Sequence, residues 1–152
     1  MTQLIDSKKM EIILIRHTSV DVLPGTCYGQ TDVPLKPTFE QEAVVTLGRL
    51  NTYTPFDQVY TSPLYRCIRL ATYCGYPDAK HDSRILELNF GDWEMQNFNE
   101  IKDPRMQEWF NDFLNVPATN GESFSMQYKR VADFLDELKT KPYFVEADMS
   151  KF

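Results

Sequence analysis

The sequence predicts a single α/β domain, and three observations carry this prediction. Short apolar runs alternate along the chain with segments of helical periodicity. The length of 152 residues suits one domain, and hydrophobic residues make up 42% of it, enough for a core. No repeat or linker divides the sequence. We therefore expect one domain over residues 1–152, with 1–9 as a flexible lead-in and 141–152 as an atypical tail.

The first element is expected at residues 12–15, where four branched aliphatic residues are typical of a buried parallel strand. Arg16 and His17 follow directly, at the carboxyl end of that strand, where open α/β sheets bind ligands. Arginine beside histidine suits an anion site, with a phosphate clamp and a nucleophile or base. The alternative is a surface pair or a salt bridge.

Helices and strands are expected to alternate through the rest of the chain. A strand is expected at 57–61, and a third strand or an extended run at 85–90. The expected helices are 38–50, 62–74, 103–114 and 123–140. Thr38 and Gln41 match a capping box at the start of the first helix. Ser62 and Pro63 are a good cap and first residue for the second, and Gly75 should end it. The buried stripe of the last helix is expected to be Val131, Phe134, Leu135 and Leu138.

Arg66 and Glu87 are two further candidate site residues. Arg66 falls in the first turn of the second expected helix, beside backbone N–H groups that favour an anion. The alternative is an ordinary solvent-facing arginine. Glu87 lies between Leu86 and Leu88, so it either faces outward from a strand or is a desolvated acid suited to proton transfer. Alternation alone favours the outward face.

Composition excludes several classes of function. Sixteen Lys and Arg against 22 Asp and Glu give a net charge of −6, which argues against nucleic acid or an anionic membrane as the main partner. No apolar stretch approaches the ~20 residues of a membrane span. Three cysteines without a C-x-x-C pair indicate reduced thiols in a cytoplasmic protein. Two histidines and no clustered ligands make a transition-metal site improbable.

Several motifs in order resemble the histidine phosphatase superfamily, which has the phosphoglycerate-mutase-like fold. Residues 16–18 look like its Arg-His-Gly signature, with Thr18 replacing glycine. Residues 27–35 are similar to a segment of its α-ribazole phosphatase branch, which dephosphorylates α-ribazole 5′-phosphate in cobalamin biosynthesis and commonly carries that threonine. The resemblance covers residues 10–140. Its other motifs, in order, look like the second phosphate-binding motif, the acid/base glutamate segment and the turn before the last long helix: residues 62–66, 86–94 and 121–123.

The resemblance implies a three-layer sandwich around a mostly parallel sheet and a phosphomonoesterase that works through phosphohistidine. His17 would be the nucleophile. Arg16 and Arg66 would clamp the non-bridging oxygens and supply charge where the transition state needs it. Glu87 would protonate the leaving alkoxide and then activate water.

The resemblance also implies what surrounds these residues. Gln30 and Thr31 would shape the pocket of a small phosphorylated substrate, and no metal or cofactor is implied because two guanidiniums balance the phosphate. The family places a second histidine, usually before glycine, on a strand after its last long helix. No histidine follows His81 here, and His81 itself is expected to be a surface or capping residue. The expected fold therefore lacks the family's last strand and closing helix.

Three functions are compatible with this sequence. The first is a shortened phosphatase, weak or inactive without the second histidine, acting on α-ribazole 5′-phosphate or on a sugar phosphate as some phosphatases and mutases do. The second is a non-catalytic module that binds phosphate esters through its arginines, and the third is an unrelated α/β interaction protein. A missing inner strand would open the sheet. Either residues 143–145 fill the gap, or two chains associate as a homodimer.

Overall fold

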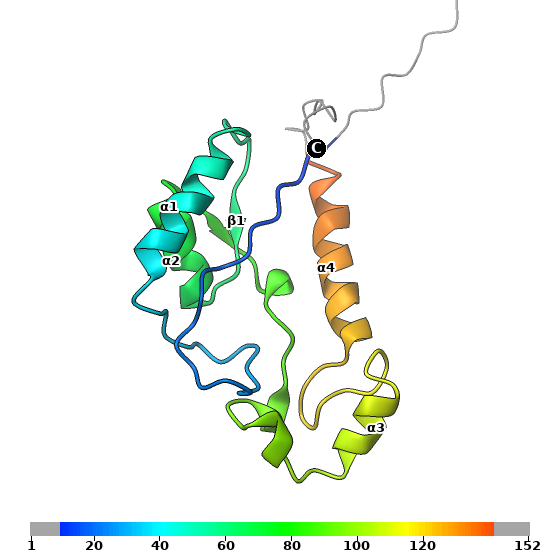
Figure 1. The fold of residues 1–152 in the computed structure, drawn as a ribbon. Coiled ribbons are helices and arrows are strands. Elements are labelled where there is room, and N and C mark those ends of the chain that lie inside the picture. The colour runs from blue at the N-terminus through cyan, green and yellow to red at the C-terminus, as the bar shows by residue number, and fades with distance from the viewer. Residues whose placement is uncertain (1–9, 142–152) are drawn as a thin grey trace, which may run out of the picture.

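The computed structural model describes residues 10–141, in which helices and strands alternate as predicted. α1 and α2 lie on one side of the central backbone, and α4 lies on the other (Figure 1). Most elements are shorter than the sequence suggested. In chain order they are α1 (Phe39–Leu50), β1 (Tyr60–Thr61), α2 (Tyr65–Tyr73), β2 (Lys80–His81), the 3-10 turns η1 (Ser83–Ile85), η2 (Gly91–Trp93) and η3 (Phe98–Glu100), α3 (Arg105–Asn111) and α4 (Phe124–Leu138).

β1 and β2 form a two-stranded parallel sheet, with Tyr60 paired to Lys80 and Thr61 to His81. α2 joins the two strands, so this is the strand–helix–strand crossover that parallel pairing requires. The parallel direction predicted from the alternation is confirmed. Only the last two residues of the strand expected at 57–61 pair within the described part of the chain.

Of the two alternatives expected at residues 85–90, the strand is wrong. The Asp82 carboxylate accepts a hydrogen bond from the Arg84 backbone N–H at 2.9 Å, and this local bond starts the turn η1. Residues 86–90 then continue without regular secondary structure. The segment that carries Glu87 is therefore irregular backbone, and side chains from elsewhere must hold it in place.

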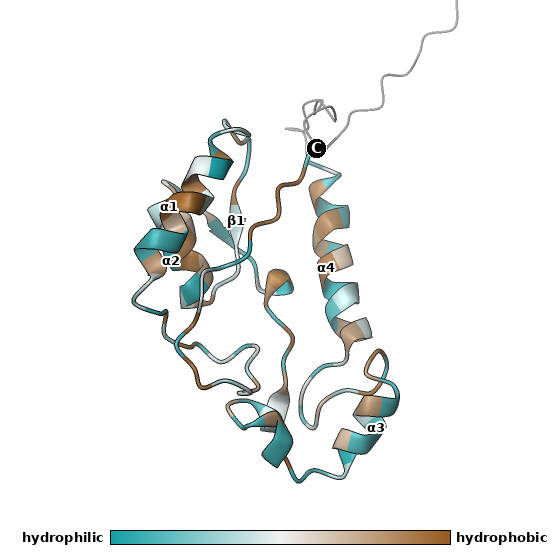
Figure 2. Ribbon diagram, viewed as in Figure 1, coloured by the Kyte–Doolittle hydropathy of each residue, from teal (hydrophilic) through white to brown (hydrophobic). Residues whose placement is uncertain are grey.

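The buried strand expected at residues 12–15 is also wrong. Ile13 packs against the core between α1 and α2, but Leu14 is 87% exposed and Ile15 is 48% exposed. Within residues 10–141 the segment makes no ladder hydrogen bonds, because no described strand lies beside it. Figure 2 shows its apolar residues running through the middle of the molecule. The segment expected to fill this gap, residues 143–145, lies outside the described residues, and association of two chains stays a prediction.

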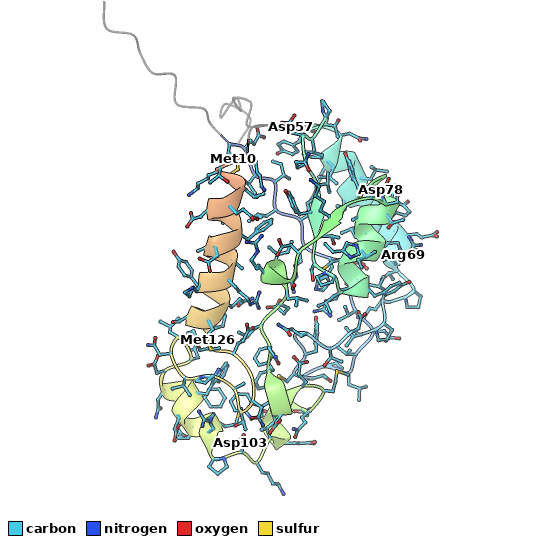
Figure 3. All side chains as sticks on the ribbon, turned by 180° about the vertical axis from the view of Figure 1, so that it is seen from behind. Met10, Asp57, Arg69, Asp78, Asp103 and Met126 are labelled. Atoms are coloured by element: carbon cyan, nitrogen blue, oxygen red, sulfur yellow. The ribbon has the colours of Figure 1, made fainter. Side chains whose placement is uncertain are left out.

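Two clusters of buried side chains hold the described residues together. Trp93, in the second cluster, is 1% exposed, and its indole Nε1 donates to the Asp103 carboxylate at 2.9 Å. The one polar atom of a large core side chain is thus satisfied. Asp103 and Met126 mark this end of the molecule, seen from behind in Figure 3. The first cluster is Phe39, Ala43, Leu50, Leu70 and Cys74, and the second is Cys27, Trp93, Met106 and Ala118.

The helix termini follow the sequence only in part. The Thr38 hydroxyl donates to Glu42 at 2.8 Å, so the capping box expected with Gln41 does not form. The expected helix start at Ser62 and Pro63 is early: α2 begins at Tyr65. Its expected end before Gly75 is confirmed: α2 ends at Tyr73, and Gly75 follows with a left-handed φ of 96°.

α4 is the element predicted best. The Ser123 hydroxyl accepts a hydrogen bond from the Met126 backbone N–H at 3.3 Å and so caps the helix. Phe134 and Leu138 of the predicted stripe are buried, and the other two members are half-buried. None of the helices in residues 10–141 has the length and apolar character that a membrane crossing requires.

Candidate active site

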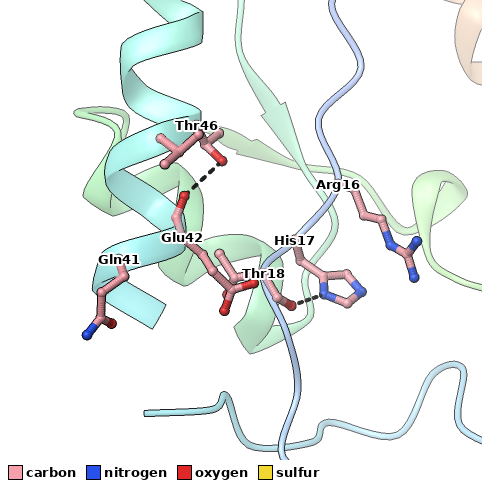
Figure 4. A pocket seen from close by; sticks show the side chains of 7 residues that line it. Arg16, His17, Thr18, Gln41, Glu42 and Thr46 are labelled. Atoms are coloured by element: carbon pink, nitrogen blue, oxygen red, sulfur yellow. Dashed lines mark hydrogen bonds between the residues drawn. The ribbon is translucent and has the colours of Figure 1, made fainter. Parts of the chain in front are cut away.

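His17 follows segment 12–15, and one of its two ring nitrogens is bound to the backbone. Its Nδ1 lies 2.7 Å from the backbone oxygen of Thr18. Because a carbonyl oxygen only accepts hydrogen bonds, Nδ1 carries the proton and Nε2 keeps its lone pair. Figure 4 shows the imidazole and the Arg16 side chain both extending away from α1.

The pKa of His17 lies below its ordinary value of 6.5. Burial lowers it most, the bond to Thr18 raises it, the positive charges of Arg66 and Arg16 lower it, and the negative charge of Glu87 raises it. The imidazole is therefore neutral at pH 7, which is the nucleophilic form. The charges of Arg66, Arg16 and Glu87 all act on the His17 ring, so the structure places these four predicted residues within electrostatic reach of one another.

Arg66 is the second residue of α2 and is 1% exposed. Its Nη1 donates to the Thr31 carbonyl at 2.9 Å, its Nη2 donates to the Gly29 carbonyl, and the guanidinium lies over the Tyr28 ring at 5.4 Å. The buried Nε has no hydrogen-bond partner in residues 10–141, and no carboxylate of that range pairs with this charge. An unpaired buried charge costs several kcal/mol, so a bound anion would stabilise it. The solvent-facing alternative for Arg66 is wrong.

A hollow of about 360 Å³ adjoins the Arg16–His17 motif on the side of α1 (Figure 4). Arg66 and Glu87 are not part of its lining, so it does not enclose all four predicted site residues. Arg16 itself is exposed. The lining residues are Arg16, His17, Thr18, Gln41, Glu42, Val45 and Thr46.

Glu87 faces outward, as the alternation of the sequence favoured, while the next residue, Leu88, is 2% exposed. The carboxylate Oε1 of Glu87 accepts hydrogen bonds from the Leu88 backbone N–H at 2.7 Å and from Gln127 Nε2 at 3.2 Å. The backbone carbonyl of Glu87 accepts from Gln30 Nε2 at 3.1 Å. The acid is therefore open to water but held from two directions.

The loop with Gln30 and Thr31 is fixed by Glu94, a residue that sequence reasoning did not single out. The carboxylate of Glu94 accepts from the backbone N–H groups of Gly29 and Gln30, both at 2.9 Å, and from the Thr31 hydroxyl at 2.8 Å. Phe90 N–H donates a fourth bond at 3.2 Å. The side chains of the two predicted pocket residues are thus bound within the chain, and their contact with substrate stays a prediction.

Gly29 lets this loop lie directly against residues 86–90, which carry Glu87 and are called the acid segment below. A Cβ at Gly29 would come within 1.8 Å of the Leu88 carbonyl oxygen, so no other residue fits there. The Asp32 carboxylate also accepts from the Tyr65 backbone N–H at 2.9 Å, which ties the loop to the start of α2. The loop therefore joins the arginine of α2 to the acid segment.

Comparison with known proteins identifies the family. Residues 12–144 match the family model of the histidine phosphatase superfamily, branch 1. The chain belongs to the histidine phosphatase superfamily. Over 136 residues it is 30% identical to the adenosylcobalamin/alpha-ribazole phosphatase of Salmonella typhimurium, a match that covers 85% of this chain and 67% of the relative.

Solved structures of this superfamily confirm the predicted phosphoglycerate-mutase-like α/β fold. The alpha-ribazole phosphatase from Shigella flexneri superposes with a TM-score of 0.69 and 26% identity, over 82% of this chain and 65% of that one. A phosphoglycerate mutase from Thermus thermophilus gives a TM-score of 0.61 and 26% identity, over 86% and 75%. The chain spans about two thirds of the length of its α-ribazole phosphatase relatives.

His81 and the three cysteines are not predicted to be site residues. His81 is exposed in β2, as expected for a surface residue. Cys27 and Cys74 are buried and Cys67 is half-buried, and all three are free thiols. Residues 10–141 hold no group of three or more His, Cys, Asp or Glu side chains suited to a metal ion. A cytoplasmic location stays a prediction.

The pKa of His17 gives the first testable expectation. In a His81→Gln variant the remaining histidine should titrate by NMR with a midpoint below 6.5, because burial and two arginines disfavour the imidazolium. Adding Arg16→Gln removes one positive charge and should raise that midpoint. A midpoint at or above 6.5 in His81→Gln would contradict the lowered pKa of His17. A midpoint that does not rise when Arg16 is also replaced would contradict the effect of the Arg16 charge.

The second testable expectation concerns the carboxylate of Glu94. Burial raises its pKa, but hydrogen bonds from Gly29, Thr31, Gln30 and Phe90 outweigh that effect and hold the pKa below 4.5. Glu94→Gln removes the charge that these donors face and should cost on the order of 3 kcal/mol in urea unfolding at neutral pH.

The matched control for Glu94→Gln is Glu100→Gln, at the exposed end of η3, which should change stability little. A depressed carboxyl pKa stabilises the folded state above the ordinary value and loses that effect as pH falls through the folded-state value. The gap between wild type and Glu94→Gln should therefore narrow below pH 4.5. A gap that stays constant as pH falls would disprove the role of the charge.

Proposed function

We propose that this chain is a phosphomonoesterase that works through a phosphohistidine on His17. The observation that carries the proposal is a neutral imidazole with a free Nε2, next to a buried arginine whose Nε–H is unpartnered within the described residues. The arginine attracts a phosphate, and the imidazole attacks it. A phosphate dianion would also supply the counter-charge that Arg66 lacks in residues 10–141.

The first chemical step forms the bond from His17 Nε2 to phosphorus and breaks the bond from phosphorus to the ester oxygen. Arg16 and Arg66 balance the charge on the non-bridging oxygens, and the Glu87 carboxyl gives its proton to the departing oxygen. In the second step Glu87 takes a proton from water as the water oxygen attacks phosphorus. The P–N bond breaks, inorganic phosphate leaves and the free imidazole returns.

We propose α-ribazole 5′-phosphate as the substrate. The support is the relative named adenosylcobalamin/alpha-ribazole phosphatase and the motif at residues 27–35, which forms the loop beside Arg66. A sugar phosphate is the alternative, since the superposed structures include a phosphoglycerate mutase.

Turnover by this chain is expected to be slow. The sequence holds two histidines, and the second, His81, is exposed in β2 instead of facing the phosphoryl oxygens. One preorganised donor fewer commonly costs about 10²–10³ in rate. Slow dephosphorylation favours direct detection of the phosphoenzyme, because the intermediate persists.

Phosphoenzyme trapping tests the proposal. The chain is mixed with ³²P-labelled α-ribazole 5′-phosphate and quenched in alkali, where phosphohistidine survives. Label should appear in wild type and in the control His81→Ala, and should vanish in His17→Ala. Peptide mapping then locates it.

Label that persists in His17→Ala would place the chemistry elsewhere. Phosphate-ester binding by calorimetry without any label in wild type would instead favour the non-catalytic binding module. Label from ribose 5-phosphate but not from α-ribazole 5′-phosphate would favour the sugar-phosphate alternative.

A further inference from the structure

α4 turns two polar side chains toward the acid segment. Gln127 and Arg130 are spaced so that they share the helix face of the buried Phe134. Arg130 has a side chain only 18% exposed. Polar groups on an otherwise apolar inner face need internal partners, and both side chains find them in the segment around Glu87.

Arg130 holds the backbone of that segment. Its Nη1 donates to the carbonyls of Arg84 at 2.8 Å and Leu86 at 2.7 Å, and its Nη2 donates to the carbonyl of Glu87 at 2.9 Å. The guanidinium is itself fixed by Glu122, whose two carboxylate oxygens accept from Nε and Nη2, each at 2.9 Å. A rigid planar fork therefore fastens irregular backbone that no sheet ladder supports.

Glu122 makes the clamp continuous with the rest of the acid segment. Its carboxylate accepts from the Asn89 backbone N–H at 3.0 Å, and its own N–H donates to the Asn89 carbonyl at 2.7 Å. Arg130 thus holds backbone carbonyls up to and including that of Glu87, and Glu122 holds the backbone N–H that follows at Asn89. Glu122 immediately precedes the capping residue Ser123, and Arg130 lies within α4.

Gln127 acts on the carboxyl group itself. Glu87 Oε1 accepts two hydrogen bonds, from Gln127 Nε2 and from the Leu88 backbone N–H. Oε2 has no hydrogen-bond partner in residues 10–141. The carboxyl is therefore oriented, with one oxygen fixed and the other available for proton exchange.

We infer that Gln127 and Arg130 are positioning residues that aim Glu87 Oε2 at the leaving-group oxygen. This rests on the proposed function, in which Glu87 gives a proton to that oxygen. Arg130 sets where the backbone of the acid lies, and Gln127 sets the rotation of its carboxyl. Displacing a reacting group by about 1 Å can cost 10² in rate, so loss of either contact should be measurable.

The test compares two phosphate esters whose leaving groups differ in their need for a proton. It thereby separates a loss of proton donation from a general loss of folded, active enzyme. A p-nitrophenolate ion departs without protonation, whereas the alkoxide of ribose 5-phosphate needs a proton from the acid. Single-turnover rates of phosphoenzyme formation are measured for both esters with enzyme in excess. The variant is Gln127→Met, which keeps the length of the side chain and removes the donor. The matched control is Gln107→Met on α3, where the glutamine is exposed and donates a hydrogen bond to Asn111.

Gln127→Met should slow the reaction of ribose 5-phosphate about tenfold or more and change that of p-nitrophenyl phosphate less than about twofold. Gln107→Met should change neither rate. Arg130→Lys, which keeps the charge but loses the fork, should show the same split. If wild type is active and Gln127→Met slows both esters equally or neither of them, the inference about Gln127 is overturned while the proposed function stands. A wild type that forms no phosphoenzyme would overturn the proposed function and this inference with it.

Discussion

Arg66 is a buried cation, only 1% exposed, and the contacts of the site are arranged around it. Burying a cation is costly unless its N–H groups are satisfied, and two loop carbonyls, from Gly29 and Thr31, accept from it. Glu94 accepts from the N–H groups of Gly29 and Gln30 in the same loop and so supports the orientation of those carbonyls. The position of the loop, and through Gly29 that of the acid segment, thus depends on holding this charge.

Ion-to-backbone contacts replace regular secondary structure around the site. Three of its segments are neither helix nor strand, and no ladder of hydrogen bonds from residues 10–141 orients them. They are residues 12–17, 28–32 and 86–90. Glu94 binds the second and touches the third, and Arg130 with Glu122 binds the third to α4. Hydrogen bonds to charged groups are worth about 1.5–3 kcal/mol each, roughly twice the neutral kind. Few such groups therefore suffice to fix irregular backbone.

Sequence periodicity predicts the parts of this molecule whose packing is local. α4 and its buried stripe were predicted well, because the apolar spacing of an amphipathic helix is visible in its own sequence and Ser123 marks its start as the capping residue. The segments at 12–15 and 85–90 failed as strands because a strand needs neighbours, and residues 10–141 supply none for either. Apolar composition indicates that a segment is favoured to be buried, but it does not show which other segment packs against it.

The candidate site divides along the same line. His17, Arg16, Arg66 and Glu87 could be found from motifs, because their chemistry demands those residue types. Glu94, Gln127 and Arg130 act through contacts distant in sequence, and only Arg130 left a trace, as a charge on the face of the buried Phe134. Pattern reasoning thus reaches the reacting groups and misses the groups that hold them.

The electrostatics of the site serve both halves of the proposed chemistry. The positive charges of Arg66 and Arg16 help to lower the pKa of His17, so the free imidazole is neutral and nucleophilic. When a phosphate dianion occupies the arginines, their charge is balanced and the imidazolium form is disfavoured less, which suits a ring that acquires positive charge as its nitrogen bonds to phosphorus. In the proposed reaction the arginines would therefore keep the imidazole neutral before the phosphate binds and would disfavour its positive charge less afterwards. Glu87 has to trade a proton with water between the two steps, and its exposure provides that path.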